Sequence, residues 1–82
     1  MQLNKFIEGL SILAQYYDKS DGYHLGADHD IIYIYPTDGP VPKVDRARLS
    51  DLGFFQPEVE CGEEGSWSPE YYDPSEGWAA YV

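Results

Sequence analysis

The sequence predicts a small α+β domain in which two helices pack on one face of a mostly antiparallel sheet. The expected order is helix, two strands, helix, two strands. Three observations support it: an apolar repeat at helical spacing near the N-terminus, a β-branched and aromatic run at residues 31–35, and alternation along residues 54–60. Because 82 residues supply one hydrophobic core, we expect one acidic domain over residues 1–82.

The first helix is predicted from a stripe of apolar residues with helical spacing, which leaves polar side chains on the opposite side. Asp and Gly between residues 18 and 22 are expected to end this helix. The stripe consists of Leu3, Phe6, Ile7, Leu10, Leu13, Ala14 and Tyr17.

Residues 31–35 predict a strand that ends before Pro36, because β-branched and aromatic residues dominate the run. A weaker run at residues 23–27 can pair with it as a hairpin across a turn at residues 28–30. Both faces of residues 31–35 are apolar, so we expect this strand to lie centrally, with one face against the first helix.

The second helix is expected to be short, with Asp45 as its N-cap and Gly53 in the left-handed position after its end. Val44 and Leu49 have the spacing of a hydrophobic staple across the first turn. Packing must stabilise so short a helix, since it would be marginal in isolation.

Residues 54–60 alternate, which predicts a strand with Phe55 and Val59 on one face. Gln56, Glu58 and Glu60 are expected on the other face. Pro57 has no N–H to donate, so this strand is expected to lie at the edge of the sheet or to contain a bulge. Residues 78–82 are expected to close the sheet as its last strand.

Charge is distributed unevenly along the chain, whose net charge is −10. Residues 1–48 carry seven acids and all five bases, whereas residues 49–82 carry eight acids and no base. So few cations disfavour direct binding of nucleic acid, because phosphates are bound by Lys and Arg. The field of the acidic part would instead attract a strongly basic protein, of which a nucleic-acid-binding groove is the commonest example.

The predicted partner-binding site combines the end of the 54–60 strand with an acidic and aromatic loop at residues 61–76. Alternate carboxylates on a strand lie about 6.6–6.8 Å apart, which is similar to the spacing of successive phosphates. Trp and Tyr are common interface anchors, and Arg stacks on their rings. In the alternative, the rings fold back onto the sheet and the acids form a solvated surface. The predicted site comprises Glu58, Glu60, Glu63, Glu64, Trp67, Glu70, Tyr71, Tyr72, Asp73 and Glu76.

The sequence predicts no catalytic residues, metal site or cofactor. His24 and His29 are the only candidates for a metal or general-base cluster, and their spacing fixes no third ligand. The lone Cys61 fits a reducing compartment, and no run approaches the roughly 18 apolar residues of a membrane span. We therefore expect a cytoplasmic monomer.

Three segments resemble small acidic proteins carried by phages and prophages. They are residues 29–33 (HDIIY), 49–55 (LSDLGFF) and 77–82 (GWAAYV). Within this group the chain is similar to anti-CRISPR proteins that inhibit type I surveillance complexes. The resemblance implies a DNA mimic that binds the basic DNA-recognition site of the complex's large subunit in the host cytoplasm.

Two other functions compete with the DNA mimic as interpretations of the sequence. The first is a protein–protein adaptor that binds through its aromatic loop or a strand edge, with acidity serving only solubility. Salt distinguishes the two, because a charge mimic loses affinity at high ionic strength and an aromatic-driven adaptor hardly changes. The second is a small enzyme or metal protein centred on His24 and His29.

Overall fold

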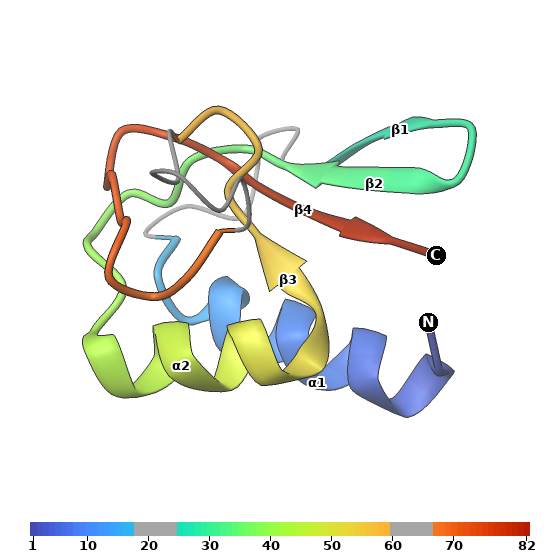
Figure 1. Cartoon of the computed structure of the whole chain (residues 1–82), viewed down its shortest axis with the longest axis horizontal. Helices are drawn as coiled ribbons and strands as arrows, with labels where there is room; N and C mark the ends of the chain where they lie inside the picture. Colours follow the sequence, from blue (N-terminus) through green and yellow to red (C-terminus); the bar gives the residue numbers. More distant parts are fainter. Residues whose placement is uncertain (18–24, 60–66) are drawn as a thin grey trace.

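The computed structural model describes residues 1–17, 25–59 and 67–82, and it confirms the predicted α+β architecture. The described residues form two helices and a four-stranded antiparallel sheet, and both helices lie on the same side of the sheet (Figure 1). The elements in chain order are α1 (Leu3–Ala14), β1 (Leu25–Asp28), β2 (Ile31–Ile34), α2 (Lys43–Leu52), β3 (Phe54–Phe55) and β4 (Trp78–Tyr81).

The strand order β1-β2-β4-β3 confirms the predicted central position of β2, its hairpin with β1 and the edge position of β3. In the register of β2 and β4, Ile34 lies opposite Trp78 and Ile32 opposite Ala80. Phe54 of β3 also lies opposite Ala80. Because paired residues share a face, these side chains form the face of the sheet that packs on the helices.

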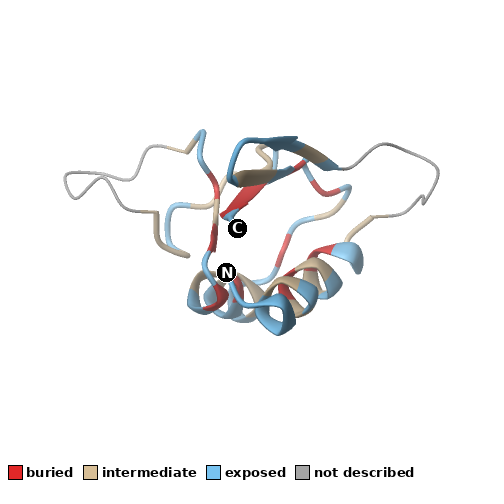
Figure 2. Cartoon of the chain, turned by 90° about the vertical axis from the view of Figure 1, so that its right-hand side faces the viewer, coloured by how far each residue is buried: buried red, intermediate tan, exposed pale blue. Residues whose placement is uncertain are grey.

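The core lies between this inner face and the two helices, where Figure 2 shows the buried residues. Gly9 of α1 is buried there because the ring of Phe54 lies directly against it. A Cβ at Gly9 would lie 2.1 Å from that ring, so only glycine allows the helix to approach this closely. The buried core cluster consists of Leu13, Ile34, Val41, Leu49, Leu52, Phe54, Trp78 and Ala80.

The first helix differs from its prediction in its end and in part of its buried face. It ends at Ala14, where the N–H groups of Gln15 and Tyr16 donate to main-chain oxygens three residues earlier. Leu3 and Ile7, expected on the buried stripe, are exposed. The buried residues of α1 are Gly9 and Leu13, and Ala14, which was also expected on the stripe, is exposed.

The second helix begins earlier than predicted, so the expected cap and staple are wrong. It starts at Lys43 after the extended residue Pro42, which places Asp45 in the first turn. Val44 is 75% exposed and therefore makes no staple. The predicted end is confirmed, because Gly53 has a φ of 99° in the left-handed region.

Among the described residues of the predicted 54–60 strand, Phe54 and Phe55 alone pair with β4. Gln56, which the alternation places on the face opposite Phe55, is 1% exposed because its side chain turns inward to hydrogen-bond the segment before β4.

The described helices, α1 and α2, contain 12 and 10 residues. Neither has the length and apolar character that a membrane crossing requires.

Candidate partner-binding surface

The segment that leads into β4 is held in place by one buried side chain, Gln56. Its Nε2 donates to the main-chain oxygens of Asp73 (2.9 Å) and Glu76 (3.2 Å). Its Oε1 accepts from the main-chain N–H of Asp73 (3.1 Å). A buried amide with three partners fixes the turn that carries Asp73 and Glu76 against the end of β3, next to Glu58.

Within that turn, the Asp73 carboxylate is ordered by Ser75. One carboxylate oxygen accepts from both the hydroxyl (2.6 Å) and the main-chain N–H (2.9 Å) of Ser75. These two hydrogen bonds lower the pKa of Asp73 below its ordinary value. Asp73 therefore stays ionised at neutral pH and keeps a fixed direction.

Two of the three predicted aromatic anchors have structural roles. Trp67 packs edge-on against Trp78, with ring centroids 5.2 Å apart, and its indole N–H donates to the main-chain oxygen of Tyr71. Tyr72 packs on the same core, and its hydroxyl accepts from the N–H of Val41 (2.7 Å). Tyr71 is exposed. For Trp67 and Tyr72 the rings fold back onto the molecule, as in the alternative interpretation of the sequence.

A depression at one end of the sheet brings together two predicted carboxylates. It lies between the end of β2, the turn after β3 and the segment before β4. Glu58 and Glu76 line it, and so do Tyr33 and Tyr35. The surface therefore combines negative charge with tyrosine rings within one concave site.

The tyrosines belong to the face of the sheet that no described helix covers. On this outer face Tyr33 lies opposite Ala79, which lies opposite Phe55. Ala79 is buried here because larger side chains flank it on both neighbouring strands. Phe55 stacks on Tyr81 with ring centroids 5.5 Å apart.

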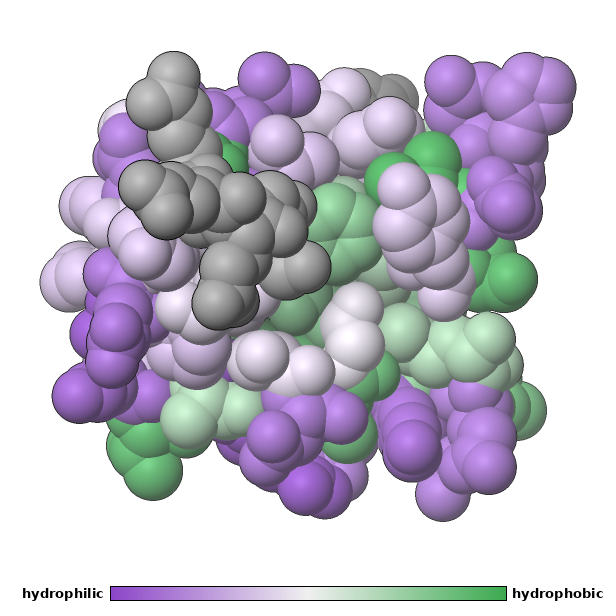
Figure 3. Space-filling model, viewed as in Figure 1, coloured by the Kyte–Doolittle hydropathy of each residue, from purple (hydrophilic) through white to green (hydrophobic). Residues whose placement is uncertain are grey.

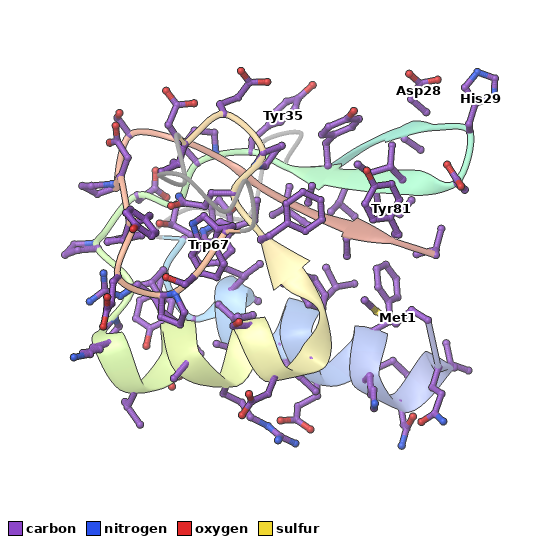
Figure 4. The ribbon with its side chains drawn as sticks, viewed as in Figure 1. Met1, Asp28, His29, Tyr35, Trp67 and Tyr81 are labelled. Carbon is purple, nitrogen blue, oxygen red and sulfur yellow. The ribbon has the colours of Figure 1, made fainter. Side chains whose placement is uncertain are left out.

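Tyr35 continues the alternation beyond the end of β2 and is half exposed. Figure 4 shows its side chain directed away from the helices, whereas Trp67 points into the molecule. The main-chain oxygen of Tyr35 accepts a hydrogen bond from the Tyr17 hydroxyl, which anchors this position to the end of α1. The outer face is therefore an aromatic surface that continues into the acidic depression.

The acids after residue 48 form no ion pair within the described part of the chain, although Arg48 attracts Asp51 electrostatically. Arg48 pairs with Glu8 of α1 through two hydrogen bonds (2.5 and 3.0 Å), which lower the pKa of Glu8. Arg46 lies over the ring of Tyr72, 4.4 Å from its centroid. No Lys or Arg in the described ranges pairs with the five acids that follow, which are Asp51, Glu58, Glu70, Asp73 and Glu76.

The tip of the β1–β2 hairpin carries further acids. Asp28 and His29 project from it (Figure 4), and the Asp28 carboxylate lies 3.6 Å from Nε2 of His29. His29 has a φ of 55°, as a tight turn requires. No three His, Cys, Asp or Glu side chains within residues 1–17, 25–59 and 67–82 are grouped closely enough to hold a metal ion.

A second exposed feature is apolar and lies near both termini. Met1, Leu3 and Val82 reach the surface there, and together with Phe6 and Ile32 they line a shallow groove. Figure 3 shows hydrophobic side chains at the surface on this side, between α1 and the sheet. This groove contains no predicted site residue.

The structure thus brings together part of the predicted site. Glu58 and Glu76 share the depression, and Glu70 and Asp73 lie on the segment that leads to it. Glu60, Glu63 and Glu64 lie outside the described residues, as do His24 and Cys61. Comparison with known protein families, curated proteins and solved structures gives no match.

Sequence reasoning did not include Tyr33 and Tyr35 in the candidate surface. The sequence does contain the relevant pattern, because tyrosines two residues apart on a strand share one face of the sheet. Both described helices pack on the opposite face, so no helix or strand of the described residues covers these rings.

Proposed function

We propose that this protein is a non-enzymatic inhibitor that binds the basic DNA-recognition site of a nucleic-acid-binding protein. The partner suggested by the sequence resemblance is the large subunit of a type I CRISPR surveillance complex. The protein would occupy the site through its acidic surface, and target DNA would then be excluded from it.

One observation carries this proposal: among the described residues, no Lys or Arg forms an ion pair with the acids after residue 48. Uncompensated charge of one sign destabilises a compact domain through self-repulsion. Arg48, the described cation closest in sequence to these acids, forms its ion pair with Glu8 and attracts Asp51 without pairing with it. The negative electrostatic field of these acids can therefore attract a basic partner.

The hydrogen bonds that hold the acidic groups in place also support the proposal. Gln56 fixes the turn that carries Asp73 and Glu76, and Ser75 orients the Asp73 carboxylate. Preorganised charges lose little freedom when a partner binds. Single exposed ion pairs contribute only about 0–1 kcal/mol, so several carboxylates must act together.

The test is displacement of DNA from purified type I surveillance complexes. Fluorescence anisotropy of a labelled target duplex would be followed while the protein is added. We expect the anisotropy to fall to that of free duplex. The double variant Glu58→Gln/Glu76→Gln should require a higher concentration, and the matched control Asp28→Asn/Asp30→Asn should behave as wild type. A duplex that stays bound at saturating protein would overturn the proposal.

The alternative function is a protein–protein adaptor, and the apolar groove near the termini favours it. Met1, Leu3 and Val82 are exposed there without a covering element in the described residues. An adaptor using this groove would lose its partner in a Leu3→Asp variant and keep it in the Glu58→Gln/Glu76→Gln variant. The inhibitor predicts the opposite pattern.

A further inference from the structure

We infer that the outer face of the sheet selects arginine over lysine, by stacking guanidinium groups on Tyr33 and Tyr35 beside the carboxylates of Glu58 and Glu76. The inference rests on the proposed function for the basic character of the partner. It adds the chemistry that the partner must present, namely arginine side chains on a protein surface.

The arrangement of rings and carboxylates is the first argument. Tyr33 and Tyr35 lie on the same side of β2, and both approach Gly26 of the neighbouring strand β1. Glu58 and Glu76 line the same depression as these rings. A cation that enters the depression therefore meets aromatic and anionic groups together.

The chemistry of the two cations decides between them. A guanidinium is planar and weakly hydrated, so it stacks on a ring while its N–H groups bind a carboxylate in a fork. An ammonium is a compact, strongly hydrated point charge that gains less from a ring face. A surface of carboxylates alone would bind both, whereas tyrosines beside carboxylates favour arginine.

The molecule itself contains one example of this contact. The guanidinium of Arg46 lies over the ring of Tyr72 at 4.4 Å from the centroid. That ring is partly buried and committed to the core through Trp78. Tyr33 and Tyr35 are exposed, so their faces can receive a guanidinium from another protein.

The test measures binding of hexa-arginine and hexa-lysine peptides by isothermal titration calorimetry at low salt. We expect the wild-type protein to bind the arginine peptide about fivefold more tightly or better, as one or two cation–π contacts imply. The variant Tyr33→Leu/Tyr35→Leu should bind both peptides with similar affinity. The matched control Tyr33→Phe/Tyr35→Phe retains both aromatic rings and should keep the preference.

A second measurement on the wild-type protein remains decisive if the double variant does not fold. In NMR spectra of the arginine-peptide complex, the arginine side-chain protons should shift upfield and show contacts to the rings of Tyr33 and Tyr35. Equal affinity for the two peptides, or the absence of these contacts, would overturn the inference.

The two proposals fail separately in these experiments. Arginine preference without displacement of DNA from any type I complex would retain this inference and overturn the proposed function. Displacement of DNA by a protein that binds both peptides equally would retain the function and overturn the inference.

Discussion

Gln56 and Asp73 exchange two hydrogen bonds, although 17 residues separate them in the sequence. The side-chain Nε2 of Gln56 donates to the Asp73 oxygen at 2.9 Å, and the Asp73 N–H donates to Oε1 of Gln56 at 3.1 Å. The amide of a buried side chain thus pairs with the backbone much as a neighbouring strand would. This pairing connects the end of β3 to the turn that carries the acids of the candidate surface.

We predict that Gln56→Met lowers the free energy of unfolding by about 2–3 kcal/mol, because it removes three hydrogen bonds and leaves buried polar groups unpaired. Urea denaturation followed by tryptophan fluorescence measures the change. Gln15→Met is the matched control, since Gln15 is exposed and should tolerate the change within about 0.5 kcal/mol. Equal stability of the two variants would contradict this role for Gln56.

We predict that Gly9→Ala destabilises the protein by about 1–3 kcal/mol, despite the higher helix propensity of alanine. The added Cβ would lie 2.1–2.7 Å from atoms of the Phe54 ring, so the helix must move away from the sheet. Gly39→Ala is the control, because no atom lies within 4 Å of its added Cβ. Thermal unfolding compares them, and a Gly9→Ala melting temperature at or above wild type would refute the close contact.

We predict an alkaline loss of stability that depends on Tyr16. Its hydroxyl donates a hydrogen bond to the Asp45 carboxylate, and this bond is the main cause that raises the pKa of Tyr16 to about 12. Because the pKa of Tyr16 is higher in the folded protein than in the unfolded chain, the neutral hydroxyl stabilises the folded state. The contribution of this hydrogen bond to the free energy of unfolding is therefore complete below the ordinary tyrosine pKa of about 10. It is lost as pH rises through about 12.

Melting temperatures of wild type and Tyr16→Phe between pH 7 and pH 12 test this prediction. The difference between the two proteins should be constant up to about pH 10 and should shrink above it. Tyr71→Phe serves as the control, since Tyr71 is exposed. A difference in melting temperature between wild type and Tyr16→Phe that stays constant from pH 7 to pH 12 would contradict this role of Tyr16.

The fold was predictable because its main signals are local. The β-branched and aromatic run of β2 and the glycine after α2 determine their elements from neighbouring residues, and the structure confirms both. The position of Gln56 was not predictable, since its three partners lie 17 and 20 residues away in the sequence. Alternation along a strand cannot distinguish a solvated amide from one that binds a distant turn.

The candidate surface was predictable only in part for a similar reason. The unequal charge of the two halves of the sequence indicates an acidic partner-binding region, but it cannot show which rings lie beside the acids. Trp67 and Tyr72 are close to the acids in sequence and pack on the core. Tyr33 and Tyr35 are distant in sequence and share the depression with Glu58 and Glu76.

The salt dependence of binding to a type I surveillance complex tests the central claim most directly. The dissociation constant would be measured by biolayer interferometry between 50 and 200 mM salt. We predict that affinity falls about tenfold or more over this range, and that Glu58→Gln/Glu76→Gln gives a shallower slope. Binding that stays unchanged over the range, or the same slope in both proteins, would contradict an acidic surface that acts in place of DNA.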